Sequence, residues 1–97
     1  MSLWLVFRPE AEGELLEARA WYENKRPGLG DEFADCVDAA IASAGRSPLL
    51  HPRVHREIRR VLIRRFPYGV FYFTEGDSLV VLAVFHCARD PRIWQTR

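Results

Sequence analysis

Cysteine is scarce in this sequence, and the amino terminus has no long apolar run. The 97 residues contain two cysteines, Cys36 and Cys87, which are too few for a disulfide framework. The apolar run Leu3–Phe7 is shorter than the core of a signal peptide, which needs about 7–15 residues. It is also far shorter than a membrane helix, which needs about 20. We therefore expect a cytoplasmic protein with free thiols and no membrane contact.

The sequence also lacks the patterns that bind common cofactors. It has no glycine-rich phosphate loop, no paired-carboxylate site and no nucleophile elbow. The adjacent pair His86–Cys87 is accompanied only by Cys36, His51 and His55, at no spacing familiar from metal sites. These absences predict a protein with no metal, no cofactor and no small-molecule substrate.

Lysine is nearly absent, and the charge is unevenly distributed along the chain. The formal net charge is +1, and thirteen of the fourteen basic residues are arginine. Residues 1–50 hold five basic and nine acidic residues, a net charge of −4, whereas residues 51–97 hold nine arginines and four acids, a net charge of +5. This asymmetry predicts an anionic partner, for which the planar guanidinium group is well suited. A GC-rich genome would give the same arginine content.

Two segments have the apolar spacing of helices. The first begins at Pro9, a residue favoured in the first helical turn, and ends at Pro27 and Gly28. The second begins near Asp31 and ends at Gly45. The apolar stripes contain Ala11, Leu15, Ala18 and Tyr22 in the first segment, and Phe33, Val37, Ala40, Ile41 and Ala44 in the second. Because few residues join them, we expect an antiparallel helical hairpin.

Four segments are rich in residues that favour strands. They are residues 3–8, Arg56–Arg65, Tyr68–Glu75 and Ser78–His86. Residues 3–8 are predicted to form a buried strand, and Ser78–His86, apolar on both faces, a central one. The tail Cys87–Arg97 is predicted to be irregular or a short helical turn. The sequence thus predicts one α+β domain over residues 1–97, of order β-α-α-β-β-β, with a helical hairpin on a mainly antiparallel four-stranded sheet.

Three stretches resemble the RelE/ParE superfamily of bacterial toxins. They are FRPEAEGELLEARAWYE near the start, RRFPYGVFY over residues 64–72, and GDSLVVLAVFHCARDPRIW over residues 76–94. The last contains the pattern H-x-x-R-x-P-x-x-W, which is typical of one branch. The resemblance implies the toxin of a type II toxin–antitoxin system, blocked by the disordered carboxyl-terminal arm of a cognate antitoxin. ParE-like members poison DNA gyrase, whereas RelE-like members cut mRNA on the ribosome.

The resemblance favours a ParE-like toxin. RelE-like ribonucleases use basic side chains, without metal, to activate a 2′-hydroxyl and stabilise the transition state. Arg60 and Arg89 fall at two of the four expected positions, but Gly69 replaces a basic residue and Gln95 lies near the expected tyrosine. His86 could act as a general acid or base, because imidazole exchanges protons near neutral pH. If the chain is a ribonuclease, its catalytic residues are therefore Arg60, His86 and Arg89. An inactive relative that only binds antitoxin is the remaining alternative.

Two surfaces are predicted to bind partners. A basic face is expected to contact the target, gyrase or ribosome with mRNA; it consists of Arg60, Arg64, Arg65, Arg89 and Arg92. The alternative is a charged strand edge, with local ion pairs to Glu57 and Asp90. The antitoxin is expected in apolar grooves beside the hairpin, at Leu15, Trp21, Tyr22, Phe33 and Val37. Trp94 is predicted to cap the sheet.

Overall fold

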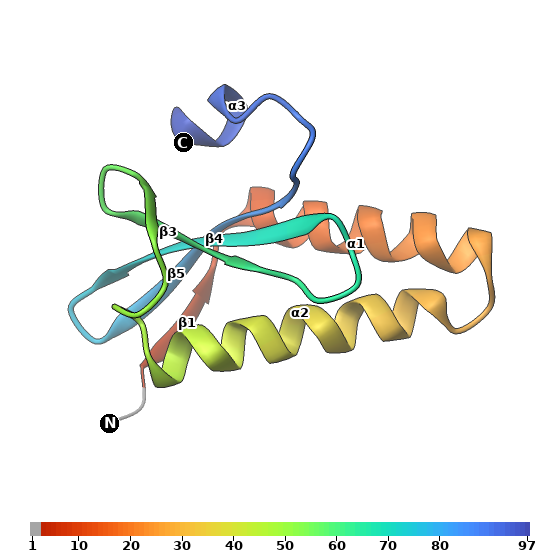
Figure 1. Cartoon of the computed structure of the whole chain (residues 1–97), viewed down its shortest axis with the longest axis horizontal. Coiled ribbons are helices and arrows are strands. Elements are labelled where there is room, and N and C mark those ends of the chain that lie inside the picture. The colour runs from red at the N-terminus through yellow and green to blue at the C-terminus, as the bar shows by residue number, and fades with distance from the viewer. Residues whose placement is uncertain (1–2) are drawn as a thin grey trace.

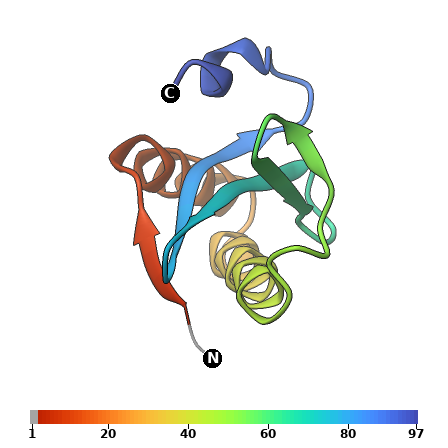
Figure 2. The same ribbon diagram turned by 90° about the vertical axis from the view of Figure 1, so that its left-hand side faces the viewer.

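A helical hairpin packs on a twisted five-stranded sheet (Figures 1 and 2). The computed structural model describes residues 3–97. Its elements are β1 Trp4–Phe7, α1 Pro9–Lys25, α2 Leu29–Arg46, β2 Arg53–His55, β3 Ile58–Leu62, β4 Tyr68–Glu75, β5 Ser78–His86 and α3 Arg92–Gln95. The predicted α+β class and the hairpin are confirmed. The predicted central position of the last strand is also confirmed, because β5 lies between β1 and β4 in the order β1-β5-β4-β3-β2.

The sheet has five strands rather than four, because Arg53–His55 forms a further strand, β2, before the predicted strand Arg56–Arg65, which is shortened to β3. Arg56 has a φ of +53°, which turns the chain so that β2 pairs antiparallel with β3. At the other end Arg65 has a φ of +70°, a left-handed conformation that a strand does not allow. The β-forming composition therefore located β3 correctly, but it did not reveal β2 or the turns at Arg56 and Arg65.

The first strand is an exposed edge and not the buried strand that its apolar sequence predicts. β1 pairs only with β5, in parallel, from Trp4 opposite Ser78 to Phe7 opposite Val81. Trp4 is 76% exposed, Leu5 53% and Val6 42%. A strand with one neighbour has one open side, so an apolar run alone does not decide burial.

The two long helices approach each other closely at their joined ends. Gly28, with a φ of +89°, precedes α2, which begins at Leu29 and so two residues before the predicted Asp31. At Gly30 an added Cβ would lie 2.7 Å from the backbone oxygen of Arg19 in α1. Only glycine fits such an approach without a shift of the backbone.

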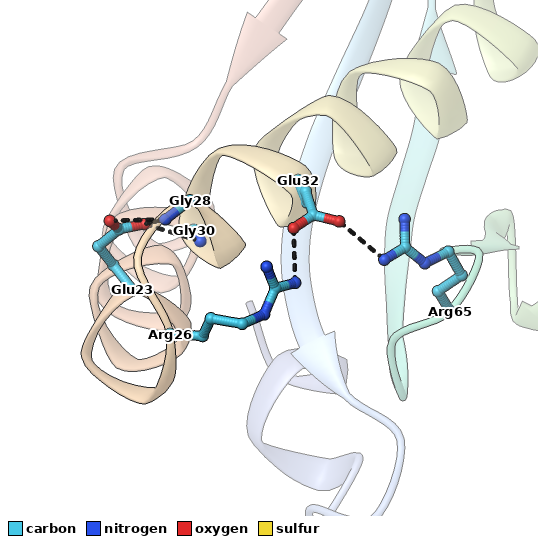
Figure 3. A network of polar contacts seen from close by, with 6 residues as sticks. All are labelled: Glu23, Arg26, Gly28, Gly30, Glu32 and Arg65. Atoms are coloured by element: carbon cyan, nitrogen blue, oxygen red, sulfur yellow. Dashed lines mark hydrogen bonds and ion pairs between the residues drawn. The ribbon is translucent and has the colours of Figure 1, made fainter.

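Polar contacts fix the hairpin tip to α2 and to the β3–β4 turn (Figure 3). The carboxylate of Glu23 accepts hydrogen bonds from the backbone N–H groups of Gly28 and Gly30, at 3.0–3.1 Å, near the start of α2. Glu32 accepts hydrogen bonds from Arg65 at 2.9 Å and Arg26 at 2.7 Å. The hydrogen bonds from Arg65 and then Arg26 hold the pKa of the Glu32 carboxyl below its ordinary value.

Apolar side chains cover both faces of the sheet. On the helix-covered face, Phe33 of α2 and Tyr72 of β4 are fully buried, and the Tyr72 hydroxyl donates to the Pro48 carbonyl at 2.7 Å. On the other face, which we call the tail-covered face, Trp94 of α3 packs on Phe71 with ring centroids 4.4 Å apart. Figure 2 shows α3 across the sheet from α2. Trp94 is 3% exposed, which confirms its predicted role as a cap.

Candidate functional site

The edge of β5 is closed by two different means. β1 covers it as far as Val81, whose carbonyl accepts the Arg8 N–H at 3.0 Å. Beyond that point Glu14 of α1 accepts the Val84 N–H at 3.1 Å, and Arg97 donates to the Leu82 carbonyl at 3.1 Å.

The residues that close this edge also hold the tail in place. The guanidinium of Arg97 pairs with the carboxylate of Glu14 at 2.8 Å, and the two side chains are only 13% and 15% exposed. The pairing with Glu14 raises the pKa of Arg97. Because Glu14 lies on α1 and Arg97 follows α3, this ion pair fixes the tail against the edge of β5.

A pocket of about 230 Å³ lies between the tail and the sheet, and we call it the tail pocket. Its lining residues are Val54, Arg60, Phe71, Phe85, His86, Cys87, Arg89, Pro91, Trp94 and Gln95. The three residues expected to be catalytic in a ribonuclease, Arg60, His86 and Arg89, are all in this lining. The walls combine apolar side chains with charged and polar ones.

Arg60 reaches the tail pocket by passing over Gly69. The residue lies on β3 opposite Phe71 of β4. A Cβ added to Gly69 would lie 3.1 Å from Cγ and 3.2 Å from Cδ of Arg60. The arginine stem therefore occupies the space that a larger side chain at position 69 would need. The glycine that departs from the ribonuclease pattern is the residue that makes room for Arg60.

The Nε atom of Arg60 is buried and has no hydrogen-bond partner among residues 3–97. Across the pocket the guanidinium of Arg89 lies 4.5 Å from the centre of the Phe85 ring, over its face. Cation–π contact of this kind holds the charge at the pocket wall without neutralising it. Arg60 and Arg89 together can therefore bind an anionic group.

His86 is held by its own turn, and its role as a general acid or base stays a prediction. Its Nδ1 accepts a hydrogen bond from the Ala88 N–H at 3.0 Å, and its ring lies 5.1 Å from that of Tyr68. The hydrogen bond from Ala88 therefore fixes the orientation of the ring and occupies its Nδ1.

The five arginines of the predicted basic face are not equally available. Arg60 and Arg89 meet at the tail pocket, whereas Arg65 pairs with Glu32 of α2 at 2.9 Å. Arg92 pairs with Asp90 at 2.7 Å. Arg64 is exposed in the β3–β4 turn. The alternative of a local ion pair therefore applies to Arg92 with Asp90, and the role of the five residues in target binding stays a prediction.

Two residues of the predicted antitoxin surface belong instead to the core. Phe33 and Val37 have no exposed surface, so neither can contact a partner on the folded chain. Both lie on the face of α2 that packs against the sheet. An apolar helical stripe predicts which face is buried, and here the chain itself covers that face.

The other three residues of that surface remain accessible. Leu15 and Tyr22 are partly buried, and Trp21 is 55% exposed. Trp21 and Tyr22 line a larger groove of about 640 Å³, which we call the helix groove. Its full lining is Glu14, Glu17, Ala18, Trp21, Tyr22, Pro67, Tyr68, Val84, His86 and Arg89.

Sequence reasoning missed most of the residues that shape these two sites. One signal was present: Glu14, Glu17, Ala18 and Trp21 are spaced i, i+3, i+4 and i+7, which places them on one face of α1. Phe71 and Phe85 of the tail pocket had no comparable signal. Successive strand residues face opposite sides of the sheet, and apolar residues occur on both sides here, so the sequence did not show which of them would line a pocket.

Within residues 3–97, no three or more histidine, cysteine or acidic side chains gather in a way that could hold a metal ion. No helix in the same part of the chain has both the length and the apolar character needed to cross a membrane.

A solved structure shares this fold. The structure described as "Chromosomal ParDE TA system from P. aeruginosa" superposes with a TM-score of 0.77, at 12% identity, over 88% of this chain and 96% of that one. The two chains therefore have the same hairpin-on-sheet architecture.

Sequence comparison then identifies the family. The family model described as "ParE toxin of type II toxin-antitoxin system, parDE" matches residues 5–91. Toxin ParE2 of Mycobacterium tuberculosis, in strains CDC 1551 / Oshkosh and ATCC 25618 / H37Rv, is 28% identical over 81 residues, which cover 82% of this chain and 77% of the relative. The chain belongs to the ParE toxin family, and an antitoxin is its expected partner.

Proposed function

We propose that this protein inhibits growth by poisoning DNA gyrase in the cytoplasm, and that a cognate antitoxin neutralises it. Membership of the ParE toxin family carries the proposal. The tail pocket supports it, because Arg60 and Arg89 form a cationic site that can bind a partner without a complete catalytic set around it. Such a toxin acts by binding, and it needs no chemistry of its own.

Induced expression without the neighbouring antitoxin gene tests the proposal. We expect growth arrest, together with accumulation of double-strand breaks that depend on gyrase. In vitro, purified toxin should increase gyrase-mediated cleavage of supercoiled DNA. Growth arrest with no effect on gyrase, in cells and in vitro, would refute the gyrase part of the proposal.

Ribosome-dependent mRNA cleavage is the second candidate function, because Arg60, His86 and Arg89 line one pocket. The stem of Arg60 lies against Gly69 and leaves no space there for a second basic side chain. Each missing transition-state group typically costs about 10²–10³ in rate. We therefore expect negligible cleavage in a ribosome assay run in parallel, and cleavage at the rate of an active RelE-like enzyme would reverse the order of the two candidates.

The toxic surface can be located with one double variant. Arg60→Ala combined with Arg89→Ala should abolish growth arrest, because it removes both cations of the tail pocket. Arg46→Gln, at the exposed end of α2, is the control and should remain toxic. Equal toxicity of all three proteins would place the toxic surface elsewhere, most simply on the helical hairpin.

A further inference from the structure

Arg60 presents a hydrogen-bond donor that the folded chain leaves unused. Its Nε is buried, and no acceptor among residues 3–97 reaches it. Buried donors without acceptors are rare in native proteins because they have lost water without replacing it. An acceptor that enters the tail pocket would satisfy this atom if the Arg60 guanidinium turned to expose it, because the atom has no contact with solvent in the free chain.

We infer that the tail pocket receives a carboxylate side chain from an acidic segment of the antitoxin, held between Arg60 and Arg89. The inference rests on the proposed function only in that an antitoxin binds this chain. Nε–H and a terminal N–H of one guanidinium together match the two oxygens of a carboxylate. Arg89, whose guanidinium lies over the Phe85 ring, adds a second positive charge. Because Arg89 is itself a donor, it leaves the Nε–H of Arg60 for the carboxylate.

The surroundings favour an acidic peptide over a nucleic-acid strand. A phosphate backbone needs a track of available cations, but Arg92 is paired with Asp90 and Arg65 with Glu32. The helix groove next to the pocket contains the carboxylate of Glu17, which would repel a phosphate, whereas the Glu14 carboxylate is paired with Arg97. A peptide with one acid and neighbouring apolar residues meets neither obstacle.

The two cavities form a path for such a peptide. His86 and Arg89 line both the tail pocket and the helix groove, so the cavities adjoin at these residues. With an acid in the tail pocket, the next residues of the segment can lie in the helix groove against Trp21 and Tyr22. A segment bound in this way covers the same two arginines that the target would meet. Neutralisation then follows from masking of the basic site.

The affinity of pocket variants for the antitoxin tests the inference. The probe is the small protein encoded beside the gene of this chain, purified with its toxin and then separated from it. We expect Arg60→Gln and Arg89→Gln each to weaken binding at least about 30-fold, mainly through faster dissociation. Arg60→Lys, which keeps the charge but loses the Nε–H, should weaken it less. The matched control Arg46→Gln should bind within about threefold of the wild type. Thermal unfolding of each variant checks that it is folded.

Changes on the antitoxin identify the carboxylate itself. Each aspartate and glutamate of its carboxyl-terminal arm is changed to the amide and combined with Arg60→Gln. One acid should show a strongly non-additive loss with Arg60→Gln and additive behaviour with Arg46→Gln.

Three results would overturn the inference in distinguishable ways. If both pocket variants bind the antitoxin within threefold of the wild type, the antitoxin does not use the pocket, although the proposed function stands. If wild-type protein binds no antitoxin at all, the proposed function fails first. If instead a 20-nucleotide single-stranded DNA binds tightly and depends on Arg60 and Arg89, the pocket is a phosphate site.

Discussion

The two faces of the sheet are covered in very different ways. The hairpin of α1 and α2 spans most of one face, where Phe33 and Tyr72 are fully buried and the Tyr72 hydroxyl has found an acceptor. The tail-covered face is covered by the short tail, whose four-residue α3 carries Trp94. This face borders the tail pocket and has a buried Arg60 Nε with no partner among residues 3–97. In this chain the well-satisfied face provides stability, and departures from good packing gather where function is expected.

Ion pairs connect the acidic half of the chain to the basic half. Glu14 of α1 holds Arg97 of the tail, and Glu32 of α2 holds Arg65 of the β3–β4 turn. These contacts neutralise arginines next to the hairpin. Arg60 and Arg89 on the tail-covered face are left as the pair with no such acid in the tail pocket lining. Part of the basic charge of the second half of the sequence therefore lies at the tail pocket.

The largest expected difference between the faces is in core substitutions. Phe33→Ala should destabilise the protein by about 3–5 kcal/mol, because the rigid hairpin and sheet cannot close the cavity. Trp94→Ala should cost the lower part of the same range, because the short tail can settle onto Phe71. Urea unfolding of the two variants provides the comparison. Equal losses of unfolding free energy would mean that the tail is packed as rigidly as the hairpin.

The ion pair between Glu14 and Arg97 should contribute less than a core aromatic residue. Arg97→Ala leaves the carboxylate of Glu14 without its cation and the Leu82 carbonyl without a donor, and we expect a loss of about 1–3 kcal/mol. Glu14→Gln keeps an oxygen for the Val84 N–H and should cost less. Thermal unfolding of the two variants shows which one loses more stability, and this comparison is the test. A larger loss for Glu14→Gln would show that charge, and not edge closure, dominates.

The sequence was sufficient to predict the fold class and the hairpin, because helix periodicity and turn residues are local signals. It was also sufficient for the central position of β5, since a strand that is apolar on both faces needs neighbours on both. It failed for β1, whose position at the edge depends on the order of strands in the sheet. It failed again at Phe33 and Val37, because an apolar stripe does not reveal whether a partner or the chain itself covers it.

The site could be predicted only in part. The positions of Arg60 and Arg89 followed from a resemblance to a family pattern, and His86 was added for its proton chemistry; the structure does bring the three together. The ion pairs of Arg65 with Glu32 and of Arg97 with Glu14 could not be anticipated, since 33 and 83 residues of sequence separate the partners. The contact between Gly69 and the Arg60 stem likewise depends on the pairing register of β3 and β4, which cannot be read from one sequence.

A smaller effect on stability is expected at Gly69. A Cβ there would lie 3.1 Å from Cγ of Arg60, so Gly69→Ala should push the arginine stem by a few tenths of an ångström. The stem is flexible, and alanine restricts the unfolded chain, so the net change should stay within about 1 kcal/mol. Antitoxin affinity should nevertheless fall, because Arg60 loses its position. Unchanged affinity would mean that Arg60 can bind from several positions.

The smallest expected effect is a pH dependence of stability that arises from Glu32 of α2, on the helix-covered side of the molecule. Hydrogen bonds from Arg65 and Arg26 lower the pKa of Glu32 from its ordinary value of about 4.5. The unfolded chain therefore takes up this proton at a higher pH than the folded chain does. The stabilisation is complete above that ordinary value and is lost as the pH falls through the lowered folded value. The difference in melting temperature between wild type and Glu32→Gln should be constant from pH 7 to about 5 and should narrow below that.

Asp90 provides the comparison for this pH effect, because Arg92 lowers its pKa in the same direction. These two residues are two positions apart, so the unfolded chain can form much of the same contact. Asp90→Asn should therefore change the pH profile less than Glu32→Gln does. High salt should reduce both effects, because both ion pairs are solvent-accessible. If the melting-temperature difference for Glu32→Gln persisted undiminished at pH 2.5, the carboxylate would not be the source of the stabilisation. The contacts in Figure 3 would then act through their geometry alone.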